Sequence, residues 1–127
     1  MKKVVAALGA AALMSAALMP AMAFAKDGDV KKSGGCSASS TWKLKLSEED
    51  GKIETEFEVD QNINGDKWRV VLKRDGKRFF RGVRTTKAPS GSFEVRRVIS
   101  NSSGPDRIRA RAVNLDTNEV CTGKATF

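Results

Sequence analysis

Four carboxylates at every second position are the first residues whose spacing could support catalysis: Glu54, Glu56, Glu58 and Asp60. Alternate residues of a β-strand lie roughly 6.5 to 7 Å apart, close to the separation of paired carboxylates in glycosidases. An open sheet face keeps such groups hydrated, so none acquires the raised pKa that acid catalysis needs. The pattern therefore favours a solvated face neutralised by lysines over a catalytic pair.

The segment that begins at Asp60 matches the first half of a calcium-binding loop. Asp60, Asn62 and Asn64 supply oxygen ligands at positions one, three and five, and Gly65 follows at position six. The twelfth position, where a bidentate glutamate belongs, is Val71. Asn64-Gly65 is also a common hairpin turn. The sequence thus predicts either a weak extracellular calcium site at Asp60, Asn62 and Asn64 or a simple turn.

Arginines at every second position from residue 107 to residue 111 must share one face of a strand. Neighbouring strands would add further cations to the same face. The predicted basic set consists of Arg69, Lys73, Arg107, Arg109, Arg111 and Lys124. Guanidinium groups bind phosphate, sulfate or carboxylate through paired donors. The alternative is that these charges serve solubility and protect sheet edges.

The strands that must position these residues are visible as period-two patterns separated by turn signals. Asp75-Gly76, for example, is a two-residue hairpin signal. Expected strands cover residues 42–46, 52–60, 67–74, 77–86, 93–98, 107–112 and 119–127. Seven short strands without helical periodicity predict an all-β fold, a seven-stranded antiparallel immunoglobulin-like β-sandwich. In that fold the arginine-rich strand lies between residues 67–74 and 119–127.

Two details of the strand pattern predict local geometry. Leu46 is expected opposite Ile53, which places Lys45 opposite Glu54 and fixes the register through opposite charges. The alternation breaks at residues 96–98, which predicts a β-bulge.

The first 25 residues are typical of a bacterial signal peptide. Lys2 and Lys3 precede an apolar, alanine-rich run, and Ala23-Phe24-Ala25 is a cleavage signal. Residues 26–40 are expected to be a flexible spacer and residues 41–127 the folded domain, with no transmembrane span after signal removal. An uncleaved N-terminal anchor is the alternative.

Cys36 and Cys121 are the only cysteines, and in an exported protein such a pair predicts a disulfide. The bridge would join the first and last strands. The chain contains no histidine, which removes Ser-His-Asp and Cys-His catalysis and the usual zinc sites. With no free thiol either, we expect a protein that is not an enzyme and has no cofactor.

Three segments carry a resemblance to a known group of proteins: residues 42–44, 85–93 and 117–121. With a cysteine before the first strand and another in the last, the chain resembles small exported immunoglobulin-like or fibronectin-III-like proteins of actinobacteria. The resemblance covers nearly all of the expected mature chain. It implies a secreted β-sandwich and assigns no activity.

The formal net charge is +8, and a basic surface speeds encounter with polyanions. The expected function is therefore a secreted, non-catalytic binding module for an anionic surface polymer, such as teichoic acid or an acidic polysaccharide, or for an acidic protein patch. It would be extracellular, either free or associated with the cell wall. Sequence-specific nucleic acid is not an expected partner, because the basic positions lack aromatic residues for base stacking. The alternative is a secreted inhibitor or effector that presents residues 87–91 or 101–106 to another protein.

Overall fold

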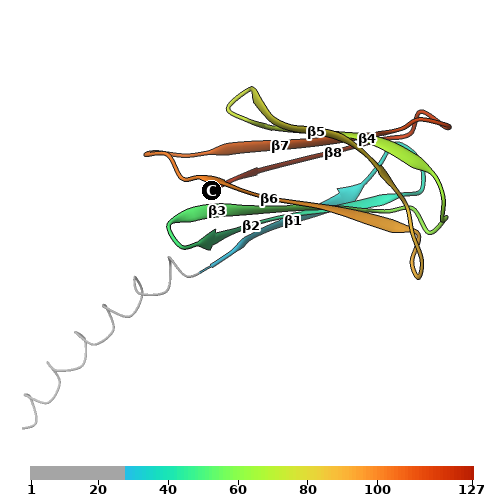
Figure 1. The fold of residues 1–127 in the computed structure, drawn as a ribbon, viewed down its shortest axis with the longest axis horizontal. Coiled ribbons are helices and arrows are strands. Elements are labelled where there is room, and N and C mark those ends of the chain that lie inside the picture. Colours follow the sequence, from blue (N-terminus) through green and yellow to red (C-terminus); the bar gives the residue numbers. More distant parts are fainter. Residues whose placement is uncertain (1–27) are drawn as a thin grey trace, which may run out of the picture.

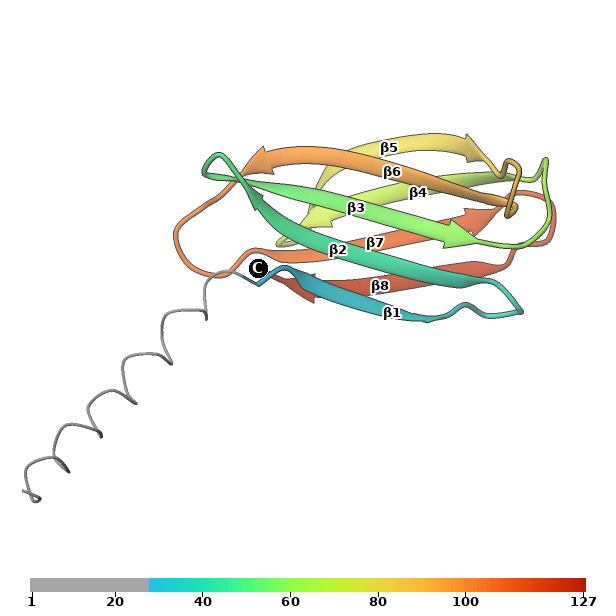
Figure 2. The same ribbon diagram turned by 90° about the horizontal axis from the view of Figure 1, so that it is seen from below.

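The computed structural model describes residues 28–127, which form two antiparallel β-sheets packed face to face (Figure 1). The strand orders are β1-β2-β3-β6 and β5-β4-β7-β8. Figure 2 shows the first of these sheets in the foreground. The strands are β1 (Val30–Gly35), β2 (Thr41–Glu49), β3 (Lys52–Asp60), β4 (Lys67–Arg74), β5 (Lys77–Thr85), β6 (Ser92–Ser100), β7 (Arg107–Asn114) and β8 (Val120–Thr126). The predicted all-β sandwich is confirmed.

Between residues 28 and 127 no helix is long and apolar enough to cross a membrane. The predicted signal peptide lies outside the described residues.

The structure has eight strands instead of the predicted seven, because residues 30–35 form β1 inside the expected flexible spacer. β1 pairs antiparallel with β2, from Val30 opposite Leu46 to Gly35 opposite Thr41. This segment of lysine, serine and glycine has no apolar alternation that would reveal a strand. Residues 30–35 form a strand because their backbone pairs with β2 and because Val30 packs against the core.

The core forms where apolar side chains alternate into the space between the sheets. Trp68 is fully buried, and its ring centroid lies 6.1 Å from that of Phe93. The indole Nε1 donates to Gln61 Oε1 at 3.0 Å. Asp66 accepts hydrogen bonds from Asn114 and Gln61, and these hold the pKa of Asp66 below its usual value. Buried polar groups around the tryptophan are thus satisfied within the protein.

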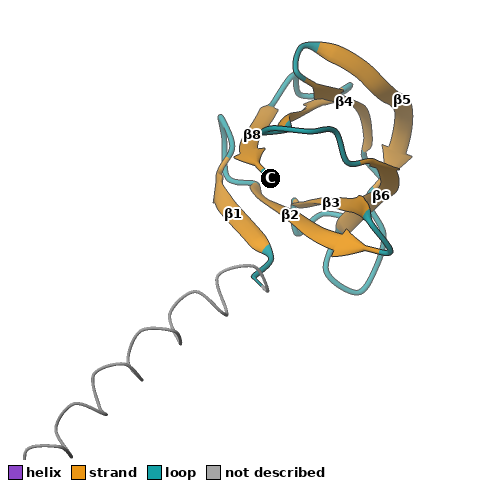
Figure 3. Cartoon of the chain, turned by 90° about the vertical axis from the view of Figure 1, so that its left-hand side faces the viewer, coloured by secondary structure: helices purple, strands orange, loops and turns teal. Residues whose placement is uncertain are grey.

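A disulfide closes the side of the sandwich where β1 and β8 meet (Figure 3). Cys36 and Cys121 are bonded, with their Cα atoms 4.4 Å apart, as predicted. The buried carboxylate of Glu119 holds the adjacent loop, because it accepts hydrogen bonds from the backbone amides of Ala38 and Ser40 and from the Ser40 hydroxyl. On the opposite side the strands β5 and β6 do not pair with each other, although Lys87 of the loop between them forms an isolated bridge with Ser92 of β6.

The predicted register of the first hairpin is wrong by two residues. Leu46 lies opposite Thr55, and Lys45 lies opposite Glu56. The strand β2 continues past its predicted end at Leu46 to Glu49, and Asp50-Gly51, with φ angles of 49° and 80°, forms a tight turn. A shift of two residues keeps every side chain on its predicted face, so the lysines still oppose carboxylates.

The predicted bulge in β6 is also wrong. β6 pairs with β3 without interruption, from Ser100 opposite Lys52 to Ser92 opposite Asp60. The alternation breaks because β6 is an edge strand, on which Arg97 occupies an inward position. The register shift lies instead between β4 and β5, at Leu72/Lys73, close to the confirmed two-residue turn at Asp75-Gly76.

Candidate functional site: a basic sheet face

Charge is distributed unequally between the two sheets. The strands β5, β4, β7 and β8 contain twelve lysine and arginine residues and no aspartate or glutamate. The strands β1, β2, β3 and β6 contain seven basic and seven acidic residues. One sheet is therefore close to neutral, and the other carries a large positive charge.

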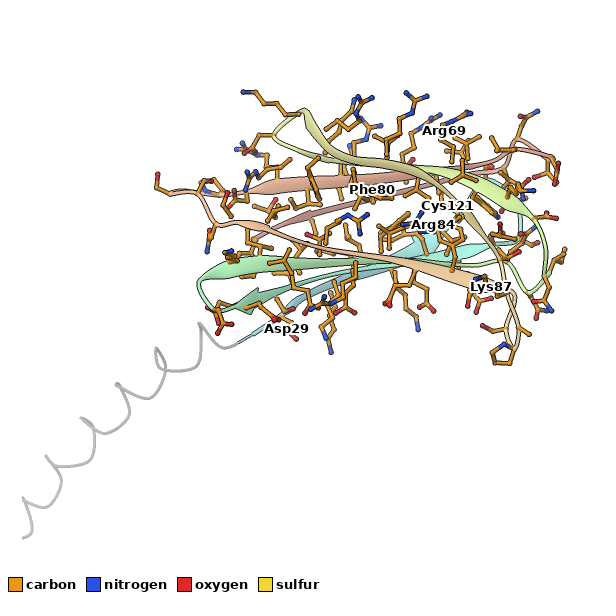
Figure 4. All side chains as sticks on the ribbon, in the orientation of Figure 1. Asp29, Arg69, Phe80, Arg84, Lys87 and Cys121 are labelled. Carbon is orange, nitrogen blue, oxygen red and sulfur yellow. A yellow bond between two sulfur atoms is a disulfide. The ribbon has the colours of Figure 1, made fainter. Side chains whose placement is uncertain are left out.

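Most of these cations project from the outer surface of their sheet, where Figure 4 shows Arg69 pointing away from the other layer. We call this surface the basic face. Its exposed members are Lys67, Arg69, Lys73, Arg78, Arg81, Arg107, Arg109, Arg111 and Lys124. All six cations predicted from the sequence belong to it.

Four members of the basic face form a row across the whole sheet. Lys73 lies opposite Arg78 on β5 and opposite Arg109 on β7, and Arg109 lies opposite Lys124 on β8. Directly opposed residues of antiparallel strands have Cα atoms about 4.5 to 5.5 Å apart. This basic row places one cation from every strand along a line perpendicular to the strands.

Arg78 and Arg81 could not be assigned to this face from the sequence, because Phe79-Phe80 leaves open which side chains of β5 point outward. Phe80 is buried, and the register shift leaves the neighbouring Phe79 as the extra residue. Arg78 and Arg81 then both project outward. Alternation counted backwards from Arg81 would have placed Phe79, and not Arg78, on the outer face.

In the described part of the chain, the cations of the basic face have no carboxylate partner. Among residues 28–127, the one ion pair that involves this sheet joins Arg74 to the buried Asp106, at 3.6 Å, and Arg74 is not a member of the face. Asp106 also accepts a hydrogen bond from the Ser102 hydroxyl. The charges of the basic face are therefore available to an external anion.

Two shallow hollows lie along the basic row. One, of about 560 Å³, is lined by Lys73, Arg107, Arg109 and Lys124 and by the Asp75-Gly76 turn, among others. A second, of about 320 Å³, is lined by Val71, Lys73, Arg109 and Arg111. Both offer donors from several strands to one anionic group. Every described tryptophan and phenylalanine is buried or half-buried, so the basic face presents no aromatic ring for stacking bases.

The carboxylate row lies on the outer surface of the other sheet, as predicted. Partial desolvation acts to raise the pKa of Glu54, but the hydrogen bond and charge of Arg96 outweigh it, and the pKa lies below its usual value. Desolvation and the charges of Glu54 and Glu94 raise the pKa of Glu56 despite the nearby Lys45. The expectation that an open sheet face raises no pKa in this row is therefore wrong for Glu56. Neighbouring lysines and glutamates line a hollow of about 430 Å³ here.

We expect opposite effects from two identical substitutions in this row. Glu56→Gln should stabilise the fold at neutral pH, because the raised pKa means that folding disfavours the Glu56 carboxylate; the advantage should vanish as pH falls below about 4.5. Glu54→Gln should destabilise it, and that difference should be lost as pH falls through the lowered pKa of Glu54. Urea unfolding between pH 3 and 7 measures both. Equal signs would contradict the assigned charge environment.

The predicted calcium residues occupy a turn stabilised from within the chain. Asp60 Oδ1 accepts a hydrogen bond from the Asn62 amide at 3.2 Å, and Asn62 has a φ of 63°. The Gly91 carbonyl accepts from the amides of Gln61 and Asn62. In the described part of the chain no three histidine, cysteine, aspartate or glutamate side chains are grouped to hold a metal. The predicted hairpin turn at Asn64-Gly65 is wrong, because β3 and β4 lie in different sheets and residues 61–66 connect the two. The local turn at Asp60–Asn62 is held by hydrogen bonds, and calcium binding at Asp60, Asn62 and Asn64 stays a prediction.

The two loops of the alternative reading lie at opposite ends of the sandwich. Residues 87–91 form a hydrogen-bonded tip with exposed Lys87 and Pro89, and Gly91 packs so closely on the Ile63 backbone that a Cβ would lie 2.3 Å from its nitrogen. Residues 101–105 are exposed. Neither loop brings a cluster of charges or apolar groups comparable with the basic face.

Fold and surface together define a disulfide-bonded β-sandwich with one strongly basic sheet. Comparison with known proteins found no matching family model, no matching curated protein and no matching solved structure. The resemblance to small exported actinobacterial proteins therefore stays a prediction.

Proposed function

We propose that this protein is a secreted, non-catalytic module that binds anionic cell-envelope polymers through its basic face. The observation that carries the proposal is the one-sided charge of one sheet, whose strands contain twelve cations and no carboxylate. Solubility alone does not require such a distribution, because mixed charges serve it equally well. The predicted signal peptide and the disulfide agree with export.

The chemistry of binding is that of repeated phosphate or carboxylate groups on a chain. Arginine offers two parallel donors to such a group, and lysine offers a point charge. The basic row, from Arg78 through Lys73 and Arg109 to Lys124, supplies both kinds in succession across the sheet. A flexible polymer could lie along this row and exchange its counterions for the cations of the protein.

Arg109→Glu is expected to weaken binding to teichoic acid roughly tenfold at low salt, because Arg109 occupies the middle of the row. The matched control is Lys31→Glu on β1, which makes the same change in net charge on the other sheet. Isothermal titration calorimetry with teichoic acid and with a uronic-acid polysaccharide measures the affinity of both variants. Comparison of the two polymers distinguishes a preference for phosphate from one for carboxylate. Equal losses in the two variants would reduce the effect to net charge and refute a specific face.

A further inference from the structure

The open side of the sandwich contains two arginines that do not belong to the basic face. Arg84 on β5 lies opposite Trp68, and Arg97 on β6 lies opposite Thr55; both partners are fully buried. Directly opposed residues of paired strands project to the same face of a sheet. Both arginines therefore start from the inner faces, at the edges where the two sheets are not joined.

The two guanidinium groups lie against the same aromatic ring. The Cζ atom of Arg97 is 4.3 Å from the ring centroid of Phe80, and that of Arg84 is 5.1 Å from it. The two cations are consequently no farther apart than the sum of these distances. Figure 4 shows Phe80 and Arg84 between the two layers. A cation over a ring face is stabilised by the ring, but two cations at one ring still repel each other.

Neither guanidinium group has a carboxylate partner among the described residues. Arg84 donates to the carbonyl of Val83 at 3.0 Å, and Arg97 donates to the carbonyl of Arg96 at 2.8 Å. Each guanidinium has five N–H donors, so most of them remain available. One bound oxyanion would neutralise the repulsion and accept several of these donors.

Two further features of the opening favour a polar ligand. Thr55 is fully buried opposite Arg97, and its Oγ1 has no hydrogen-bond partner within residues 28–127. A buried hydroxyl is costly unless a polar group reaches it. A hollow of about 430 Å³ continues along the same opening, with Arg84, Lys87 and Glu94 in its lining.

We propose that Arg84 and Arg97 form a second anion site, which takes a single oxyanion group (phosphate, sulfate or carboxylate) beside the Phe80 ring. The site is separate from the basic face, because both arginines project from the inner faces of edge strands and not from the outer surface. The competing explanation is that inward charges on β5 and β6 only prevent edge-to-edge aggregation. That explanation predicts no saturable response to anions.

The test is a titration of the full disulfide-bonded protein with sodium phosphate, sodium sulfate or sodium acetate at constant ionic strength with sodium chloride. Tryptophan fluorescence reports on Trp68, which lies opposite Arg84, and on Trp42, so a Trp42→Phe protein is titrated in parallel to isolate the Trp68 signal. We expect saturation in the wild type, a dissociation constant roughly tenfold higher in Arg84→Gln and Arg97→Gln, and a smaller loss in Arg97→Lys. Tighter phosphate or sulfate than acetate would assign a tetrahedral anion, and the reverse a carboxylate.

Arg109→Glu separates this site from the basic face, because it should leave the fluorescence titration unchanged while it weakens polymer binding. Since Arg97 is exposed, Arg97→Gln is expected to fold even if Arg84→Gln does not. A response that fails to saturate, or that is identical in the wild type and Arg97→Gln, would overturn the second site. Neither result would affect the proposed function of the basic face.

Discussion

Removal of the disulfide, through the double substitution Cys36→Ala/Cys121→Ala, is expected to lower the free energy of unfolding by about 4 to 5 kcal/mol. The bridge closes a loop with a sequence separation of 85 residues, and on the chain-entropy model a loop of that size strongly restricts the unfolded ensemble. Since small domains are stable by only about 5 to 15 kcal/mol, the variant should be marginal. Urea unfolding followed by circular dichroism measures the change.

Removal of the disulfide should disturb the structure around the bridge as well as lower the free energy of unfolding of the whole domain. The bridge holds β1 against β8 beside the loop that the Glu119 carboxylate caps, and Lys124 of the basic row lies three residues beyond Cys121. Reduction of the wild-type protein is the matched control, because it breaks the same bond without a substitution. A loss below about 1 kcal/mol in both experiments would contradict the structural role of the bridge.

Reversal of three charges in the basic row, through Lys73→Glu/Arg109→Glu/Lys124→Glu, is expected to reduce affinity for teichoic acid by at least about 100-fold at low salt. The three residues lie opposite one another on adjacent strands, so the substitution removes attraction and adds repulsion at one place. All three are exposed, and surface changes of this kind usually cost little stability. Equilibrium dialysis measures the affinity, and circular dichroism checks the fold.

The matched control for this variant is Lys31→Glu/Lys32→Glu/Lys43→Glu, which makes the same change in net charge on the β1-β2-β3-β6 sheet. We expect it to retain most of the affinity. If the two triple variants lose affinity equally, the basic face has no special role, and the proposed function is wrong.

Residues with strict alternation could be predicted from the sequence because their periodicity alone fixes the face on which they lie. Arg107, Arg109 and Arg111 alternate with buried Ile108, Ala110 and Ala112, and the structure confirms their outward placement. The disulfide was predictable because the chain offers each cysteine one partner.

Edge strands could not be predicted in the same way, because backbone pairing and register, not apolar patterning, decide their structure. β1 has almost no buried side chain of its own. On β5 a one-residue irregularity next to the Asp75-Gly76 turn determines that Arg78 and Arg81 share a face. On β6 the inward-facing Arg97 interrupts the apolar alternation, so the sequence pattern looks like that of a bulge although the pairing is regular. The two anion-binding surfaces proposed here both depend on such edge residues.

The most direct test of the account is the salt dependence of teichoic acid binding by the wild-type protein. If the basic face neutralises anionic groups of the polymer, the logarithm of the association constant should fall linearly with the logarithm of salt concentration, with a slope near the number of groups contacted. The magnitude of this slope should be smaller by about three in the Lys73→Glu/Arg109→Glu/Lys124→Glu variant. Binding that does not depend on salt, or a slope that the three substitutions leave unchanged, would contradict the account.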